Sequence, residues 1–459
     1  MHDKHEGSDA EMPGTSLERK LEKITPPFQR FIHDQSTGSV LLIICTLAAL
    51  VVANSTLSHG YESLLLTQVG LVFGDWSLAM SLHDWINEGL MSLFFFVLGL
   101  EIKRELLVGE LKNPRQSVPM IAAALGGMLM PALIFAAFTA GTPVVHGWGI
   151  PMATDTAFAV GMLALLHRHV PTALTAFLTA LAIIDDLGAI LVIAMFYTAN
   201  INLLLLATAA LLLVLLIGLN AAGVRRPAVY ILVGGLVWLA MLGSGVHATV
   251  AGILVALTVP ARPKRGPGWF VRHAHRLTHE FETMERQSDK PLLGEEEQHR
   301  VAESLQTTVE KATTPLRRWE RYLERPVALL VMPLFALANA GIPLDSQTLA
   351  SLGSNPLTPA IVLGLLFGKV LGITLLTWLS LRFGLGQLSS GIGMRHIAGI
   401  GLLGGMGFTM SIFIANLGFE TVPATLVAAK TAILLASLLA GISGYLWLRF
   451  RGHPHVNSE

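Results

Sequence analysis

Charged residues are scarce in this 459-residue sequence, and cysteine is almost absent. Asp, Glu, Lys and Arg together make up 14% of the chain, against about 25% in soluble globular proteins. Basic and acidic residues balance at 31 each, so no excess of positive charge indicates a nucleic-acid partner. Cys45 is the single cysteine, which excludes an internal disulfide framework, a zinc–thiolate cluster and a redox pair. This composition therefore excludes an ordinary soluble enzyme.

Long runs of apolar residues recur along the chain. Hydrophobic residues make up 53% of the chain, and runs near the roughly 20 residues that a helix needs to cross a bilayer recur along it. The runs are continuous rather than alternating, which favours helices over the strands of a membrane barrel. We therefore expect an all-α polytopic membrane protein, with about 12 transmembrane helices in a membrane domain over residues 38–450.

Lysine and arginine mark one side of the predicted membrane domain. Loops at 59–81, 141–147, 198–202 and 343–355 contain neither residue. Since positive loops face the cytoplasm, we expect both termini on the cytoplasmic side. The loops and span ends on that side carry the following residues: Lys103, Arg104, Lys112, Arg115, Arg168, Arg225, Arg226, Arg382, Arg395, Arg449 and Arg451.

Four segments outside the spans have patterns of their own. Residues 1–37 repeat apolar positions at helical spacing, which predicts a cytoplasmic N-terminal segment with a helix on the membrane face. Residues 64–80 are rich in strand formers and are interrupted by Gly74–Asp75, which predicts a small external β-hairpin. Residues 262–325 hold 13 basic and 11 acidic residues and are expected to form a solvated cytoplasmic insertion, helical or partly disordered. Residues 451–459 are expected to be a short cytoplasmic tail.

Four ionisable residues lie at a depth where charge is costly in a membrane. Asp155, the pair Asp185 and Asp186, and Lys369 fall near the middle of three predicted spans, and such residues mark ion or substrate pathways. A purely structural alternative is a single Asp–Lys pair that locks two helices together. That pair would leave two further carboxylates without a cation, so we interpret the group as a site.

Two of the predicted spans look interrupted halfway. One reads GIPMATDTAFAVG around Thr154 and Asp155, and the other reads GIGLLGGMGFTMS, with a glycine run in its middle. Unwound backbone at this depth is tolerated only where it lines a cavity. We expect two broken, crossing helices, with Asp155 facing helix N-termini and Lys369 facing C-termini. Close packing of glycines is an alternative reason for the second run.

The two interruptions also take matching places along the chain. Each lies in the middle of a group of three spans, and the two groups begin on opposite sides of the membrane. This arrangement is the sequence pattern of an inverted repeat.

Adjacent carboxylates at Asp185 and Asp186 suit a site that holds either a hard cation or protons. Na⁺ takes oxygen ligands, and two carboxylates out of water repel each other and compete for protons as well. Competition at one site with alternating access is sufficient for exchange. If each carboxylate carries one proton, two protons move per monovalent cation and the cycle is electrogenic.

Six segments together resemble one protein family. IPMATDTAFAVGMLALL, LTALAIIDDLGAI, GSGVHATVAGI, MPLFALANAG, LLFGKVLGI and GMGFTMSIFIA are similar to segments of the NhaA-type bacterial sodium–proton antiporters. The resemblance runs from Gly38 to Leu448. It implies a pH-regulated transporter of the bacterial inner membrane that extrudes Na⁺, and Li⁺ as well, in exchange for external H⁺. It implies no cofactor and no enzymatic reaction, and the external hairpin is a candidate homodimer contact.

The resemblance also implies roles for individual residues. Asp185 and Asp186 match the ion- and proton-binding pair of the family. Thr154 and Asp155 match the polar residues of its first helix break, and Lys369 matches the lysine that faces the site. Four further residues match positions linked to pH response: Glu101, Glu105, Glu320 and His247.

Three other classes of membrane protein are alternatives. An intramembrane aspartyl protease would need its carboxylates on separate helices in YD and GxGD motifs, and neither motif occurs. A sodium-coupled solute symporter of similar architecture would need a pocket for an organic substrate, and no Tyr or Trp stands beside the helix breaks. A channel is less favoured, because a charge-paired site at the membrane centre favours ion binding over the rapid passage that a channel needs.

Overall fold

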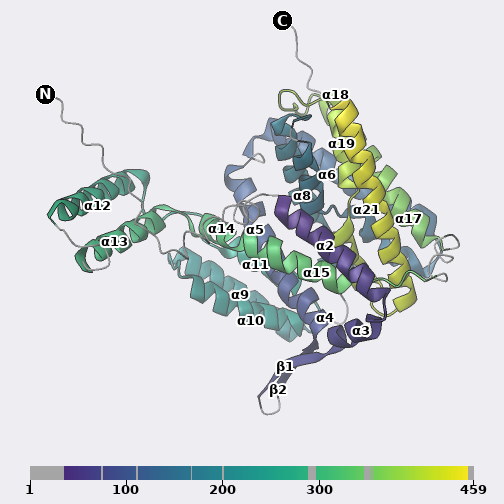
Figure 1. Cartoon of the computed structure of the whole chain (residues 1–459), viewed down its shortest axis with the longest axis horizontal. Helices are drawn as coiled ribbons and strands as arrows, with labels where there is room; N and C mark the ends of the chain where they lie inside the picture. The colour runs from purple at the N-terminus through teal and green to yellow at the C-terminus, as the bar shows by residue number, and fades with distance from the viewer. Residues whose placement is uncertain are drawn as a thin grey trace, which may run out of the picture.

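The described part of the chain is almost entirely helical (Figure 1). The computed structural model describes residues 36–452, apart from 74–75, 110–111, 167, 199–200, 288–295, 346–352 and 354. The helix expected near the N-terminus and nearly all of the tail expected at the C-terminus therefore lie outside the described residues.

The first part of the chain forms spans and the external hairpin. In order, its elements are α2 (Ser36–Ala53), α3 (Ser58–Leu66), β1 (Gln68–Phe73), β2 (Trp76–Ser81), α4 (Leu82–Asp84), η1 (Trp85–Leu90), α5 (Met91–Val108) and α6 (Pro114–Thr139). The helices α4, η1 and α5 form one continuous span. The strands pair antiparallel, from Gln68 with Ser81 to Phe73 with Trp76. The small β-hairpin predicted from the sequence is therefore present, and it projects from the helical body (Figure 1).

The middle of the chain contains the first helix break and the charged insertion. Its elements are η3 (Pro143–Met152), α7 (Thr156–Leu165), α8 (Thr172–Phe196), α9 (Leu203–Ala221), α10 (Pro227–Leu242), α11 (Thr249–Thr258), α12 (Pro267–Gln287), α13 (Glu296–Ala312) and α14 (Pro315–Pro326). The described part of the insertion is thus helical. Figure 1 shows α12 and α13 side by side and away from the other helices.

The last part of the chain contains the second break. Its elements are η5 (Val327–Val331), α15 (Met332–Asn339), α17 (Leu357–Leu363), η6 (Gly364–Gly368), α18 (Lys369–Arg382), α19 (Met394–Gly404), α20 (Phe408–Gly418) and α21 (Pro423–Arg451). The elements η1, η5 and η6 are π-helical turns inside longer helices, and such turns are frequent at functional sites.

The described helices include seven that are long and apolar enough to cross a membrane, or nine when each sharply bent pair is taken as one span. The shorter apolar helices α10 and α11, and the continuous segment of η5 and α15, occupy the remaining predicted positions. Many large apolar side chains of α9 and α10 are exposed, as expected for surfaces that face lipid. The chain is an all-α polytopic membrane protein.

The helices that begin the two groups of three spans pack backbone against backbone. A Cβ atom at Gly126 of α6 would meet the carbonyl oxygen of Gly372 of α18, and a Cβ atom at Gly372 would meet that of Gly126. Only glycine permits this approach. The contact is reciprocal, as between elements related by a two-fold axis, which is the relation expected of an inverted repeat.

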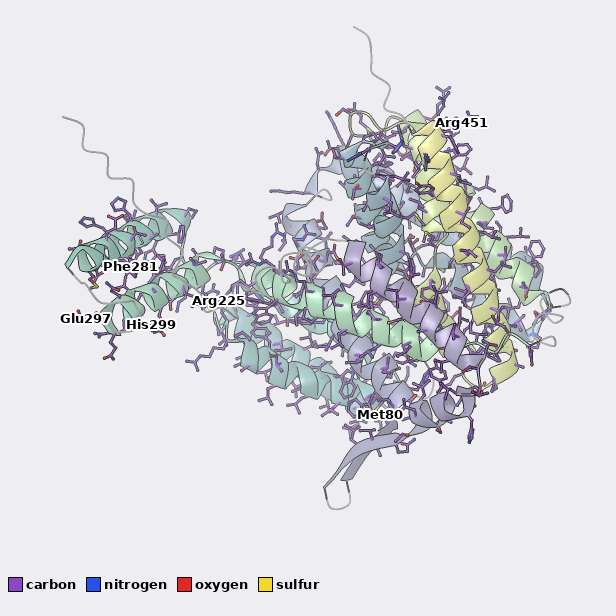
Figure 2. All side chains as sticks on the ribbon, viewed as in Figure 1. Met80, Arg225, Phe281, Glu297, His299 and Arg451 are labelled. Atoms are coloured by element: carbon purple, nitrogen blue, oxygen red, sulfur yellow. The ribbon has the colours of Figure 1, made fainter. Side chains whose placement is uncertain are left out.

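The two sides of the molecule differ in charge. Figure 2 shows Arg451, at the end of α21, and Met80, in the hairpin, at opposite ends of the body. Arg225 lies between α9 and α10 at the end of that helix pair away from the hairpin (Figure 2). The side that carries Lys and Arg in the sequence is therefore opposite the hairpin, and we call the hairpin side the outer side.

Candidate ion-binding site

Both predicted helix breaks are present, and they cross. The first unwound segment lies between η3 and α7, and the second lies between α19 and α20, where the helix axis bends by 47°. The backbone N–H of Asp155 donates to the carbonyl oxygen of Met406 at 2.6 Å. The hydroxyl of Ser411 donates to the carbonyl oxygen of Ile150 at 2.7 Å. The two breaks thus satisfy each other's backbone groups, as buried unwound chain requires.

Asp155 binds the N-termini of two half helices. One carboxylate oxygen accepts from the backbone N–H of Phe158 at 3.1 Å, which makes Asp155 the N-cap of α7. The other accepts from the backbone N–H and the hydroxyl of Thr409, at 3.0 and 2.5 Å, at the start of α20. Because helix N-termini carry partial positive charge, this buried carboxylate is compensated without a cation.

Lys369 binds one member of the carboxylate pair. Its ammonium lies 2.5 Å from Asp185 Oδ2 and 2.9 Å from Thr154 Oγ1, and all three side chains are fully buried. The sequence-based expectation placed Lys369 against helix C-termini. A full negative charge at hydrogen-bond distance attracts the ammonium more strongly than a partial helix charge. The threonine hydroxyl has one proton, with Asp185 Oδ2 at 2.8 Å and the carbonyl oxygen of Gly404 at 3.0 Å as acceptors.

Asp186 follows Asp185 on α8 but faces a different direction, as adjacent residues on a helix do, and among the described residues no hydrogen bond or ion pair joins it to Lys369. Its nearest hydrogen-bond donor in the described chain is the Thr156 hydroxyl, at 3.4 Å from Oδ2. Oδ1 of Asp186 and Oδ1 of Asp185 are buried and have no hydrogen-bond partner among the described residues. Buried polar atoms without partners are costly. Oxygen atoms of this kind are suitable ligands for a hard cation and acceptors for protons.

A cavity of about 860 Å³ approaches this pair from the side that carries Lys and Arg. It lies among the end of α5, the start of α6 and the start of α8, and its lining includes Arg104, Glu105 and Thr179. Thr179 precedes Asp186 by two helical turns, so both side chains lie on the same face of α8. The cavity therefore leads toward Asp186.

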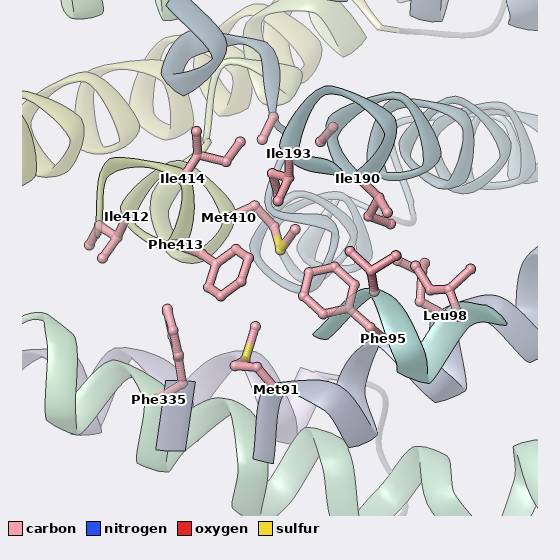
Figure 3. Packing of buried hydrophobic residues seen from close by; sticks show 14 of the residues in the cluster. Met91, Phe95, Leu98, Ile190, Ile193, Phe335, Met410, Ile412, Phe413 and Ile414 are labelled. Carbon is pink, nitrogen blue, oxygen red and sulfur yellow. The ribbon is translucent and has the colours of Figure 1, made fainter. Parts of the chain in front are cut away.

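On the outer side of the pair, an apolar plug closes the space between the helices. The rings of Phe95 and Phe413 pack with centroids 5.4 Å apart. Figure 3 shows how buried side chains from α5, α8, α15 and α20 meet at this place. We call these residues the plug: Met91, Phe95, Ile190, Ile193, Phe335 and Phe413. The carboxylate pair is thus approached by a cavity from one side and covered on the other.

Three of the residues matched to pH response meet at a single arginine. Arg104 lies 2.8 Å from Glu105, 3.7 Å from Glu101 and 2.7 Å from Glu320. Glu320 is on α14, so the arginine joins α14 to α5. Burial raises the pKa of Glu320, although the nearby Arg104 and Arg317 lower it.

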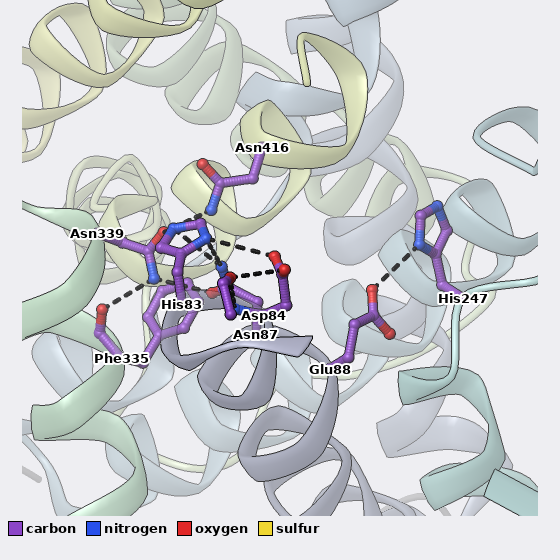
Figure 4. A network of polar contacts seen from close by, with 9 residues as sticks. His83, Asp84, Asn87, Glu88, His247, Phe335, Asn339 and Asn416 are labelled. Carbon is purple, nitrogen blue, oxygen red and sulfur yellow. Dashed lines mark hydrogen bonds and ion pairs between the residues drawn. The ribbon is translucent and has the colours of Figure 1, made fainter. Parts of the chain in front are cut away.

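His247 lies far from this cluster, at the outer start of α11. Its Nδ1 is 3.5 Å from Glu88 Oε1, and its Nε2 is 2.9 Å from the carbonyl oxygen of Tyr197. Figure 4 shows the contact between Glu88 and His247. Sequence reasoning named neither Glu88 nor Arg104 as a site residue. Both stand in the span that also holds Glu101 and Glu105, where a lone charge near a helix end gives no clear signal.

The Na⁺/H⁺ antiporter 1 family model matches residues 29–448 of the chain. The chain belongs to the NhaA-type sodium–proton antiporter family. It is 47% identical over 440 residues to the Na⁺/H⁺ antiporter NhaA 1 of Saccharophagus degradans, covering 96% of this chain and 95% of the relative. It is 48% identical over 441 residues to the Na⁺/H⁺ antiporter NhaA of Oleidesulfovibrio alaskensis, covering 96% and 97%.

The family settles the class of the protein. This antiporter is a multi-pass membrane transporter that exchanges Na⁺ and H⁺, and it is not an enzyme. The resemblance found in the sequence is confirmed, and the symporter alternative has no support.

Proposed function

We propose that Asp185 and Asp186 are the shared binding site for Na⁺ and protons in this antiporter. The observation that carries the proposal is that both carboxylates are buried and each has one oxygen without a partner among the described residues. A bound Na⁺ would satisfy these oxygens, and so would protons. Because the two cannot occupy the same oxygens at once, binding of one displaces the other.

The proposed cycle is secondary active transport, in which the proton gradient drives Na⁺ out of the cytoplasm. Na⁺ enters through the cavity and displaces one proton from each carboxylate, so two protons move per Na⁺. Li⁺ is a smaller hard cation that takes the same oxygen ligands, and we propose it as a second substrate.

Thr154, Asp155 and Lys369 hold the helix breaks around this site. Asp155 compensates the N-termini of α7 and α20, and the Thr154 hydroxyl connects Lys369 to Asp185. Lys369 binds the ionised form of Asp185 in the step of the cycle in which this carboxylate holds neither a proton nor Na⁺. When Na⁺ binds Asp185, it compensates the carboxylate charge in place of the Lys369 ammonium. The ammonium is then free to move, so ion binding can alter the packing of α18.

We propose that Glu101, Glu105 and Glu320 contribute to pH response through their common partner Arg104. Protonation of a glutamate in this cluster replaces its ion pair with Arg104 by a neutral contact, and so alters the connection between α14 and α5 at the edge of the cavity. His247 is a second candidate, through its contact with Glu88 on the outer side. The two locations allow a response to pH on each side of the membrane.

The distribution of Lys and Arg supports an orientation in the inner (plasma) membrane of a bacterium with both termini, and the charged insertion at 262–325, in the cytoplasm. The external hairpin has edge strands that could pair with a second copy of the chain, since exposed edges are templates for pairing. We propose this hairpin as a homodimer contact. Light scattering in detergent, with and without residues 68–81, would measure its contribution.

Transport by purified variants in proteoliposomes tests the shared site. Asp185→Asn and Asp186→Asn keep the size of each side chain but remove one ionisable group. We expect Na⁺-driven proton movement, followed with a pH-sensitive dye, to fall to the level of protein-free liposomes in both variants. The same assay with Li⁺ and K⁺ determines the ion preference.

The matched control is Glu62→Gln, which changes an exposed carboxylate on α3 and should transport like the parent. Size-exclusion profiles in detergent establish that each variant is folded. Near-normal transport by either aspartate variant would contradict the shared site.

A further inference from the structure

A second cluster of polar side chains lies on the outer side of the plug. It joins four elements through His83 of α4, Asn87 of η1, Asn339 of α15 and Asn416 of α20 (Figure 4). Asn339 and Asn87 are buried, with exposures of 1% and 9%, whereas the side chain of His83 is 31% exposed. We call these four residues the outer latch. None of them was named from the sequence.

The orientation of the Asn339 amide follows from its neighbours. Its Nδ2 donates to the carbonyl oxygen of Phe335 at 3.0 Å and to Asn87 Oδ1 at 2.8 Å. A carbonyl oxygen can only accept, so the amide nitrogen must face Phe335. Oδ1 of Asn339 then faces its other two partners, Asn416 Nδ2 at 2.6 Å and His83 Nε2 at 3.2 Å.

This arrangement fixes the protonation state that His83 needs. Asn87 accepts at its oxygen, so its Nδ2 faces the ring and lies 3.1 Å from both Nδ1 and Nε2 of His83. Nε2 faces the Asn339 oxygen, so it must carry the proton. The latch therefore closes as a ring of three hydrogen bonds only with neutral His83 in the Nε2–H tautomer.

The latch lies directly above the plug on three elements. Along each helix, a latch residue is followed one turn deeper by a plug residue: Asn87 by Met91, Asn339 by Phe335 and Asn416 by Phe413. Side chains one turn apart share a helix face. The same bonds that join the latch therefore hold the plug closed.

The latch is also connected to the crossing of the helix breaks. Asn416 lies on α20, two turns from Thr409, whose backbone and hydroxyl bind Asp155. Its partner Asn339 lies on α15, outside the broken spans, and Asn339 in turn binds Asn87 of η1. Any movement of α20 that opens the outer side must break the contact between Asn416 and Asn339.

We propose that the outer latch is a proton-controlled gate of the outward pathway. With His83 neutral, Asn87 fixes the amide of Asn339, and Asn339 holds α20 against α15 through Asn416. A proton taken from the outside onto the ring leaves His83 with no acceptor for the donating amide of Asn87, so that contact breaks. Asn87 then no longer fixes Asn339, and the bond from Asn339 to Asn416, which holds α20, is weakened. The assignment of this route to the transported ions rests on the proposed function of Asp185 and Asp186.

Two charged side chains act on the His83 ring, and the partners from the remaining elements are neutral amides. Asp84, next to it on α4, has Oδ1 3.7 Å from Nδ1. It is the acceptor to which a protonated ring would turn. Lys430 of α21 is the other charged group. A supply of external protons would thus open the side from which the transporter takes its protons.

Access to a buried position behind the latch tests this gate directly. Ala415 is fully buried beside Asn416 on α20. We would place the single cysteine Ala415→Cys in a Cys45→Ala background, in right-side-out membrane vesicles. A positively charged, membrane-impermeant methanethiosulfonate is added outside, and its labelling rate is divided by that of His59→Cys, an exposed position on α3. The ratio cancels the pH dependence of the thiol itself.

With His83 present, we expect the ratio to rise about tenfold between about pH 8 and about pH 5.5, across the range in which histidine titrates. His83→Gln offers the same donor and acceptor without titrating, so its ratio should stay low at every pH. His83→Ala removes both bonds, so its ratio should be high at every pH.

A pH-dependent ratio in His83→Gln, or a flat ratio in the parent, would overturn the gate. The labelling measures access and not ion movement. It should give the same result in an Asp186→Asn background, so failure of the ion-site proposal and failure of the latch are separate outcomes.

Discussion

At the residue scale, the three buried carboxylates of the site differ in what compensates their charge. Asp155 is bound by backbone N–H groups and a hydroxyl, and Asp185 is bound by an ammonium. Asp186 has only a distant hydroxyl among the described residues. The least compensated carboxylate is the one toward which the cavity leads, which suits the group that first exchanges a proton for Na⁺.

Lys369→Ala tests how much the buried ion pair between Lys369 and Asp185 contributes to the stability of the fold. Removing one partner of a buried pair costs about 3–5 kcal/mol, because the other charge is left without compensation. We expect a clear fall in the melting temperature in detergent at neutral pH and an altered pH profile of transport. Lys430→Ala is the control, since Lys430 forms no ion pair with the described carboxylates. Equal melting temperatures for the two variants would show that the pair does not stabilise the fold.

The sequence predicted the depth of these charges but not their pairing. Charged residues inside apolar runs are visible without a structure. Which of the three carboxylates pairs with Lys369 depends on how α8 and α18 pack together. Asp185 and Lys369 lie 184 residues apart in the sequence. The outer latch was missed for a related reason, since single Asn and His residues near the ends of spans have no pattern until three helices bring them together.

At the scale of elements, the broken helices and the hairpin were predictable because each has a local cause. Asp155 and the small polar residues beside it cannot continue an apolar helix unpaired, and a glycine run weakens the second helix. The π-helical turns η1, η5 and η6 were not predicted. One extra residue in a turn leaves an apolar pattern intact, so its cause lies in the packing around it.

Glu320 allows a pH test of the contact between α14 and α5. Its pKa is raised above the ordinary value of 4.5 by burial, so the folded protein binds this proton more tightly than the unfolded chain. The stability that it contributes is therefore present below pH 4.5 and is lost as the pH rises through the raised pKa. We expect Glu320→Gln to reduce the decline of the melting temperature over this range.

The control for this measurement is Glu62→Gln, which changes an exposed glutamate on α3 and should leave the decline unchanged. A slope that is identical in Glu320→Gln and the parent would mean that Glu320 does not titrate over this range. Transport measured over the same pH range separates an effect on stability from an effect on pH response.

At the scale of the whole molecule, access to the carboxylate pair is one-sided. The cavity leads toward it from the side that carries Lys and Arg and extends as far as Thr179 and Ala180. The plug and the outer latch cover the pair from the other side (Figures 3 and 4). The reciprocal contact of α6 with α18 relates the two groups of spans that contain the breaks. A rearrangement of these groups that closes the cavity and opens the plug would give the opposite state, as alternating access requires.

The charge moved in one cycle follows from the number of carboxylates that titrate. If Asp185 and Asp186 each release one proton when Na⁺ binds, two protons enter for each Na⁺ that leaves, and one net positive charge moves inward. A membrane potential contributes about 2.3 kcal/mol per charge per 100 mV, so an inside-negative potential should drive Na⁺ out without a pH gradient. We expect Na⁺ efflux against its gradient from proteoliposomes at equal pH on both sides, with the potential imposed by K⁺ and valinomycin. Asp186→Asn is the control and should show no potential-driven Na⁺ efflux. Efflux that ignores the potential would mean that only one aspartate titrates, or that Lys369 exchanges a compensating proton.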